Sequence, residues 1–281
     1  MKNPLLNVRE EDISRYLARL AADEKAAATM EKYSCAVHAF RRWLDGEPAS
    51  QERAVAYKNE LAENRAASGV NAALAALNGF FRFMEWSIRV KPLKIQRQTF
   101  LSEEKELTRA EYERLLQAAK EAGDERLYAV LQTICATGIR VSELRYVTVG
   151  AARKGQVVIR NKGKTRTAFL PRKLQAALLA YVKKRGISAG SVFITKNGNP
   201  LDRKSIWAAM KKLCALARVA AAKVFPHNLR RLFARLFYRR EKDIMHLADI
   251  LGHSDVNTTR LYVRESEKKH RLRVEALCLV T

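Results

Sequence analysis

Apolar side chains recur every three or four residues over much of the first 86 positions of the chain. Ile13, Tyr16 and Leu20 follow this spacing, and the stretch 30–44 repeats it. This period is typical of helices that bury one face. The pattern predicts a compact bundle of four short amphipathic helices. The N-terminal caps are expected at Thr29, Ser50 and Ser68, and the third helix is expected over Gln51–Asn64.

The helical pattern stops near residue 88. The stretch 88–103 has no helical stripe, and it holds a proline and four cations, which indicates an extended basic segment. We therefore expect a helical domain over residues 1–88, a basic interdomain linker over 89–103 and a second domain over 104–281.

The second domain begins with a strong helix signal, because Thr108 and Glu111 have the spacing of a capping box. Further along, the stretches 156–160 and 165–170 flank a basic turn and predict a β-hairpin, with a third short strand expected at 192–195. The predicted fold is mainly α with a small antiparallel β-sheet. Helices are expected over 125–136 (ended by Gly138), 173–185, 203–222, 227–240 and Ile244–Leu251, and one more helix is expected to reach Tyr262. Ser142 and Ser254 are the expected N-caps of the helices that follow them. The tail over 267–279 is expected to be amphipathic.

The charge of the chain is strongly positive. Lys and Arg number 53 against 29 Asp and Glu, which gives a formal net charge of +24, and most of the excess lies after residue 100. Such an excess is typical of nucleic-acid-binding proteins and exceeds what a soluble surface needs. The candidate DNA contacts are Arg89, Lys91, Lys94, Arg97, Lys164, Arg203, Lys204 and Lys211.

The four cysteines, Cys35, Cys135, Cys214 and Cys278, lie far apart, which argues against a zinc site or a disulfide framework. No signal peptide and no apolar run of membrane-spanning length is present in the sequence. We therefore expect a reducing, cytoplasmic setting with no membrane partner.

Several side chains suited to phosphate chemistry follow one another in the second domain. His227 and Arg230 are three residues apart and so share one face of a helix, while His253 and Tyr262 come later. Each also has a simpler interpretation. A helical His and Arg pair more often contacts DNA without catalysis. The simpler interpretations of the others are a solvated turn for Lys162, a cap of helix carbonyls for His253 and a core position for Tyr262.

The order of these residues resembles the tyrosine recombinases, also called the phage integrase family, and especially its short Xer-like members. The residues 136–144 match the first box around Arg140, Lys162 falls at the hairpin lysine, and His227 with Arg230 matches the His-x-x-Arg box. The residues 251–253 match the Leu-Gly-His box, and Tyr262 follows nine residues after His253.

The rest of the chain extends the resemblance and shows one departure. The N-terminal bundle is similar to the core-binding domain of the family, and the second domain is similar to its α+β catalytic domain. No additional arm-binding domain is expected, because the bundle begins within about ten residues of Met1. The family usually has a second histidine directly after the box arginine, where this chain has Arg231. We expect activity to survive that difference.

The resemblance implies cleavage and rejoining of DNA through a 3′-phosphotyrosyl intermediate, with strand exchange through a Holliday junction. Tyr262 would be the nucleophile, Lys162 would protonate the 5′-oxygen that leaves, and His227 would exchange the tyrosine proton. The bond energy is kept in the intermediate, so no cofactor is expected, and no carboxylate cluster suggests a metal.

The remaining side chains of the predicted site are suited to the negative charge on the phosphate oxygens. Arg140 and Arg230 would clamp the non-bridging phosphate oxygens, and His253 would bond to one of them. Glu143 is expected to orient neighbouring basic groups without touching the phosphate.

The resemblance also implies assembly on double-stranded DNA, as a dimer on each site and a homo-tetramer during exchange, with accessory proteins as further partners. Two alternatives remain open at this stage. One is a relaxase similar to type IB topoisomerases, and the other is a catalytically silent DNA-binding or architectural protein.

Overall fold

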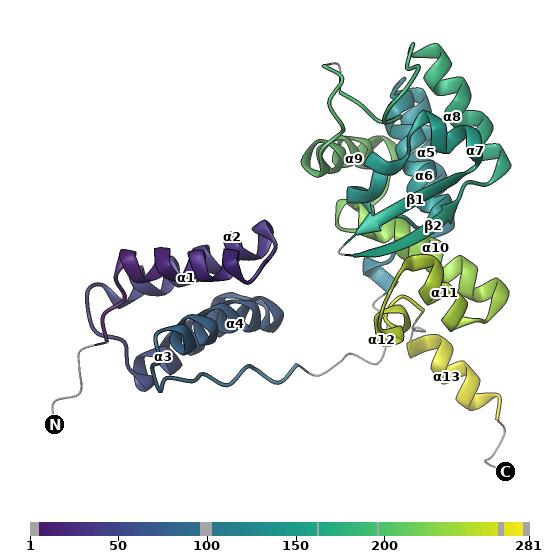
Figure 1. Ribbon diagram of the computed structural model, residues 1–281. Coiled ribbons are helices and arrows are strands. Elements are labelled where there is room, and N and C mark those ends of the chain that lie inside the picture. The colour runs from purple at the N-terminus through teal and green to yellow at the C-terminus, as the bar shows by residue number, and fades with distance from the viewer. Residues whose placement is uncertain (1–5, 96–102, 162, 196, 264–266, 278–281) are drawn as a thin grey trace, which may run out of the picture. The chain divides into compact units, whose positions relative to one another are not determined.

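The computed structural model of the chain describes residues 6–95, 103–161, 163–195, 197–263 and 267–277 (Figure 1). The chain divides into two compact units, Met1–Arg97 and Gln98–Thr281. Among the described residues helices predominate, and one antiparallel pair of strands forms the sheet. This confirms the predicted fold class.

The N-terminal unit is a bundle of four helices around an aromatic core. Phe40, Phe80 and Phe81 are fully buried, and the rings of Phe40 and Phe81 meet edge to face with their centroids 5.6 Å apart. Aromatic pairs in this geometry add to the stability gained from burial. The bounds of the helices are Glu10–Ala22 (α1), Ala27–Leu44 (α2), Gln51–Asn64 (α3) and Ala67–Phe83 (α4).

The caps of these helices follow the prediction only in part. The Ser50 hydroxyl accepts a hydrogen bond from the backbone N–H of Arg53 at 3.2 Å, as expected of an N-cap. Thr29 and Ser68 were wrong predictions, since both lie inside the first turn of a helix that begins earlier. Ala26 and Ala66 occupy the two N-cap positions and offer no side-chain bond. Burial of the apolar faces therefore stabilises these starts in place of caps.

The segment after α4 is extended and fixed on the N-terminal unit. The Asn78 amide exchanges two hydrogen bonds with the backbone of Val90, and the Asn71 amide does the same with Leu93, all between 2.8 and 2.9 Å. Ile88 and Val90 are buried in the core of the bundle. Within residues 89–95, expected as the first half of a linker, Val90 and Leu93 are thus held by side chains of α4, and Arg89 is held by Gln51 of α3.

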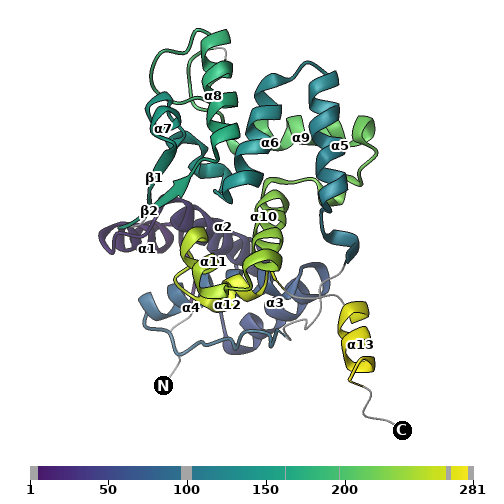
Figure 2. The same ribbon diagram turned by 90° about the vertical axis from the view of Figure 1, so that its right-hand side faces the viewer.

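The C-terminal unit is organised around α6, which is buried along most of its length and packs against α5, α8, α9 and α10 (Figures 1 and 2). Helix α5 begins at the predicted capping box: the backbone N–H of Glu111 donates to the Thr108 hydroxyl, and the backbone N–H of Thr108 donates to the Glu111 carboxylate. The helical elements are η1 (Glu103–Lys105), α5 (Arg109–Glu121), α6 (Glu125–Thr137), η2 (Val141–Tyr146), α7 (Val149–Lys154), α8 (Arg172–Lys184), α9 (Arg203–Ala217), η3 (Ala221–Lys223), α10 (Pro226–Glu241), α11 (Ile244–Leu251), α12 (Val256–Arg260) and α13 (Glu267–Glu275).

The predicted hairpin is present as β1 (Gln156–Asn161) and β2 (Lys164–Phe169), paired antiparallel from Gln156 opposite Phe169 to Asn161 opposite Lys164. The third strand expected at 192–195 was a wrong prediction for the described residues. Val192 and Phe193 are buried, and the segment around them makes only isolated bridges, so this apolar run serves core packing.

Three further boundaries in this unit differ from the prediction. α9 ends at Ala217, because Arg218 takes a left-handed conformation at φ 50°. The cap before η2 is Arg140 and not Ser142, and the cap before α12 is Asp255 and not Ser254. In addition, α12 ends at Arg260, two residues before Tyr262, which it was expected to reach.

The tail forms α13, where the apolar side chains Leu272 and Val274 are exposed. Across the parts of the chain that the structure describes, no helix combines the length and the apolar character needed to cross a membrane.

Candidate active site

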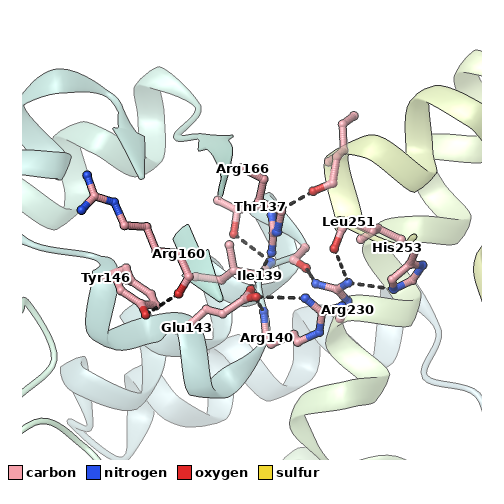
Figure 3. A network of polar contacts seen from close by, with 12 residues as sticks. Thr137, Ile139, Arg140, Glu143, Tyr146, Arg160, Arg166, Arg230, Leu251 and His253 are labelled. Atoms are coloured by element: carbon pink, nitrogen blue, oxygen red, sulfur yellow. Dashed lines mark hydrogen bonds and ion pairs between the residues drawn. The ribbon is translucent and has the colours of Figure 1, made fainter. Parts of the chain in front are cut away.

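Arg230 lies at the centre of a polar network in the C-terminal unit (Figure 3). It projects from α10, and only 1% of it is exposed. Its guanidinium donates to the carbonyl of Gly138 at 2.6 Å and to the carbonyl of Leu251 at 2.7 Å. Burial, followed by the nearby charge of Arg140, lowers the pKa of Arg230 to about 10, which still leaves the side chain charged at neutral pH. The network therefore holds a buried cation at the junction of α6, α10 and α11.

His253 lies against this guanidinium. Its Nε2 is 2.9 Å from Nη2 of Arg230, and its Nδ1 is 2.8 Å from the hydroxyl of Thr259. Because a guanidinium can only donate, Nε2 must accept and the proton of the neutral ring must reside on Nδ1. Burial, and then the charges of Arg230 and Arg140, lowers the pKa of His253 to about 4. The ring is therefore neutral at pH 7.

Arg140 and Glu143 form a second pair beside Arg230. Arg140 precedes the 3-10 helix η2, and both its backbone N–H and its Nη1 donate to the Glu143 carboxylate, at 2.7 and 2.9 Å. Glu143 is 2% exposed, whereas the Arg140 side chain is 36% exposed. The buried carboxylate thus fixes a guanidinium whose outer face remains open to solvent.

Arg166, on β2, belongs to the same network, although the sequence motifs did not single it out. Its Nη2 donates to Glu143 at 2.5 Å, and its Nη1 donates to the carbonyl of Ile250 at 2.9 Å. It therefore joins the hairpin to the end of α11. One signal in the sequence was available: strand alternation puts residue 166 on the same face as buried Ala168, and a cation on that face needs a buried partner.

Tyr262 lies beside His227, with its hydroxyl oxygen 3.1 Å from the ring Nε2. Tyr262 is 6% exposed and packs against Leu247 and Leu251 of α11. Its ring also meets the ring of His253 edge to face, with centroids 5.3 Å apart. The phenol therefore lies between the two predicted histidines.

His227 is exposed at the first turn of α10, and Arg231, Arg230 and Arg140 are charged groups that act on its ring. Loss of hydration, followed by the charges of Arg231 and Arg230, lowers the pKa of His227 to about 4. The imidazole is therefore neutral at pH 7, and it can accept a proton.

Five of the six predicted catalytic residues thus come together in one unit, from the position before η2, from α10 and from the turns that follow α11 and α12. Lys162 and Arg97 lie outside the described residues, and for Lys164 only the backbone position in β2 is described. Of the other candidate DNA contacts, exposed side chains are found at Arg89, Lys91, Lys94, Arg203 and Lys204, and a half-buried one is found at Lys211.

The surface of α9 and the distribution of metal-binding side chains bear on which other ligands this unit could bind. Lys211 lies over the exposed ring of Trp207, with its ammonium 5.1 Å from the ring centroid, so α9 presents an aromatic side chain among cations. Among the residues that the structure describes, no three His, Cys, Asp or Glu side chains gather as a metal ion would require.

Comparison with known proteins places this geometry in a family. Residues 105–269 match the model of the phage integrase family. The tyrosine recombinase XerD of Xanthomonas campestris pv. campestris is 30% identical over 292 residues, which cover 92% of this chain and 89% of that protein.

Two solved structures have the same fold. XerH bound to its difH substrate in a pre-cleavage complex superposes with a TM-score of 0.74 at 16% identity, over 99% of both chains. A lambda integrase tetramer bound to a Holliday junction superposes with a TM-score of 0.74 at 18% identity, over 92% of this chain and 78% of the other. The chain therefore belongs to the phage integrase family, as its motifs predicted.

Proposed function

We propose that this chain is a site-specific DNA recombinase in which Tyr262 cleaves and rejoins one strand at a time. The observation that carries the proposal is the position of Tyr262, whose hydroxyl is 3.1 Å from the neutral imidazole of His227 and whose ring meets His253, the hydrogen-bond partner of Arg230. A phenol beside a base and next to fixed cations is the arrangement that nucleophilic attack on a phosphodiester requires.

In the first step, the phenol oxygen attacks the phosphorus and the bond to the 5′-oxygen breaks. This leaves a 3′-phosphotyrosine and a free 5′-hydroxyl. His227 takes the phenol proton through Nε2, and the leaving oxygen takes a proton from Lys162. In the second step, the 5′-hydroxyl of the partner strand attacks the phosphotyrosine and returns the phenol. Because one ester is exchanged for another, no nucleotide cofactor is needed.

The negative charge of the transition state is balanced by Arg140 and Arg230. The Arg140 side chain is partly exposed, and its hydrogen bond to Glu143 fixes its orientation. It can therefore bind the non-bridging oxygens without reorganisation. Arg230 is buried and contributes its positive charge, and among the residues that the structure describes its Nε has no hydrogen-bond partner.

His253 joins these groups once DNA is bound. Its Nε2 accepts from Arg230 in the free protein, so it must gain a proton before it can donate to a phosphate oxygen. The negative charge of the phosphate favours that gain.

Double-stranded DNA is the proposed partner, and the excess of 53 basic over 29 acidic side chains supports it. The similarity to XerH on its difH substrate supports DNA as the partner, and the similarity to a lambda integrase tetramer on a Holliday junction supports a tetramer during exchange, with a dimer on each site as part of the proposal. We also propose that the protein acts in the cytoplasm and that accessory proteins are further partners.

The test is covalent capture in cells. Protein and DNA are separated under denaturing conditions, and the DNA that stays attached is sequenced. We expect wild-type protein to recover one recurrent sequence attached at Tyr262. Recovery of DNA without a shared sequence would favour a relaxase, and recovery of none would favour a silent DNA-binding protein.

Two variants locate the nucleophile. Tyr262→Phe should bind the recovered duplex as wild type does, yet form no adduct. Tyr238→Phe is the matched control, because Tyr238 packs against the same small core as Tyr262 and should keep the adduct. An adduct that persists in Tyr262→Phe would contradict the proposal.

A further inference from the structure

Arg231 is the position at which this chain departs from the usual box of its family, and it lies directly beside the nucleophile. The guanidinium carbon of Arg231 is 5.8 Å from the centroid of the Tyr262 ring. A cation at this distance is attracted by the π electrons of the ring. Arg231 follows Arg230 on α10, but it turns to a different set of partners.

The other end of this contact is Glu106. Its carboxylate is 5% exposed, and its Oε1 lies 3.3 Å from Nη1 of Arg231. Its Oε2 forms an ion pair with Arg235 at 3.2 Å. A buried carboxylate is stable only with cations beside it, so Glu106 holds both guanidinium groups in place. Arg231 therefore has a fixed anchor on one side and the tyrosine ring on the other.

The anchor is itself immobilised on α10. The Asn228 amide donates to the Lys105 carbonyl at 2.8 Å, and Arg235 donates to the Leu107 carbonyl. Asn228, Arg231 and Arg235 are spaced by three and four residues, so they form one face of the helix. This face binds the segment 105–107, which leads into α5. The position of Arg231 is thus determined by backbone contacts on both sides of Glu106.

We propose that Arg231 is a positioning residue for the nucleophile: its guanidinium, fixed by Glu106, holds the ring of Tyr262 so that the hydroxyl stays beside His227. The inference rests on the proposed function of Tyr262. The contact also favours the reaction, because negative charge that develops on the attacking phenol spreads into the ring below the cation.

The first experiment needs no DNA. Tetranitromethane nitrates tyrosines according to their exposure and ionisation, and mass spectrometry of peptides gives the extent at Tyr262. We expect Arg231→Gln and Glu106→Gln to raise the nitration of Tyr262 several-fold over wild type when the rate is expressed per ionised phenol, because the released ring is more accessible to the reagent. Arg239→Gln, which removes an exposed cation from the same helix, is the control and should leave it unchanged.

The second experiment measures adduct formation in a single turnover, at saturating concentration of the duplex recovered by covalent capture. Loss of a contact of this kind should slow the step about tenfold in Arg231→Gln. Arg231→Lys should recover part of the rate because it keeps the charge, which a merely structural role would not explain. Adding Glu106→Gln to Arg231→Gln should slow the step little further, because Glu106 acts on Tyr262 through Arg231.

Two outcomes would overturn the inference: nitration of Tyr262 that is the same in Arg231→Gln as in wild type, or an unchanged rate of adduct formation in that variant. If wild-type protein forms no adduct on any DNA, the proposed function fails instead. The nitration experiment would then still decide whether Arg231 positions Tyr262. Thermal unfolding of each variant separates a lost contact from a lost fold.

Discussion

Arg166 fills the space that a side chain on residue 252 would need. Its Cδ lies 2.4 Å from the position that a Cβ on Gly252 would take, and the backbone of Gly252 has a φ of +66°. The same Arg166 binds the carbonyl of Ile250 and the carboxylate of Glu143. The glycine before His253 is therefore required twice, once by the left-handed turn after α11 and once by the arginine that joins this turn to the hairpin.

Replacing Gly252 by alanine should therefore cost more than a left-handed alanine alone. We expect Gly252→Ala to lower the free energy of unfolding by about 2–4 kcal/mol, since backbone strain adds to the displacement of Arg166. Gly186→Ala is the matched control, because Gly186 has a φ of +67° and open space around it. Urea unfolding of both variants gives the comparison. Equal losses would mean that contact with Arg166 has no energetic consequence.

Glu143 should prove important for both stability and activity. It accepts hydrogen bonds from the backbone and side chain of Arg140 and from Arg166, and it is 2% exposed. Glu143→Gln keeps the shape but leaves two cations without a counter-charge, so we expect a loss of about 2–4 kcal/mol. Adduct formation should fall as well, because Arg140 loses its fixed orientation.

The control for this variant is Glu113→Gln, which breaks an exposed pair with Arg109. That change should cost less than about 1 kcal/mol. Urea unfolding and single-turnover adduct formation measure both effects. A Glu143→Gln protein as stable as Glu113→Gln would contradict the role assigned to the buried carboxylate.

The two site histidines predict how stability depends on pH. Burial and neighbouring arginines lower the pKa of His227 and of His253 to about 4, below the ordinary value of 6.5. Between these values the unfolded chain binds protons that the folded chain does not. The free energy of unfolding should therefore fall as the pH drops from 6.5 to 4, and these two groups should contribute no slope above that window.

Urea unfolding at several pH values without DNA measures this slope. His253→Gln should flatten it, because one of the two groups no longer titrates. Histidine NMR resonances provide a direct check, since the rings of His227 and His253 should titrate well below pH 6. Titration of either near 6.5 would contradict the environment described for it.

Much of the fold could be predicted from apolar spacing, since α3 and α11 have the bounds expected from the sequence. The errors arose where a local signal competed with packing. Thr29 and Ser254 have the chemistry of caps, but the helices beside them begin at positions set by burial and by Asp255. The end of α9 lies in an alanine-rich stretch that continues to favour helix, and nothing in the sequence there marks Arg218 as left-handed.

The site could be predicted as far as its motifs extend. Arg140, His227, Arg230, His253 and Tyr262 occur in short recognisable boxes, and the structure brings them together. Residues outside the boxes were missed because their partners are distant in sequence. Arg166 meets Ile250, which is 84 positions away, and Glu106 meets Arg231, which is 125 positions away. These ion pairs and hydrogen bonds form because folding buries the charged groups, and a buried charge without a partner is costly. The sequence alone does not show which distant residues will be buried together.

Lys162 remains a prediction from sequence, because it lies outside the described residues. The described pairing of the hairpin ends with Asn161 opposite Lys164, and Arg166 fixes the hairpin to the site. If Lys162 protonates the leaving 5′-oxygen, Lys162→Ala should slow adduct formation by about 10²–10⁴-fold.

A substrate with sulfur in place of the bridging 5′-oxygen tests this role directly, because a thiolate leaves without a proton. Lys162→Ala should regain most of the wild-type rate on that DNA. Lys164→Ala provides the comparison from the same hairpin: any loss it causes should come from weaker DNA binding and should persist on the sulfur substrate. Equal behaviour of the two variants would remove Lys162 as the acid and leave the source of the proton to another group of the site.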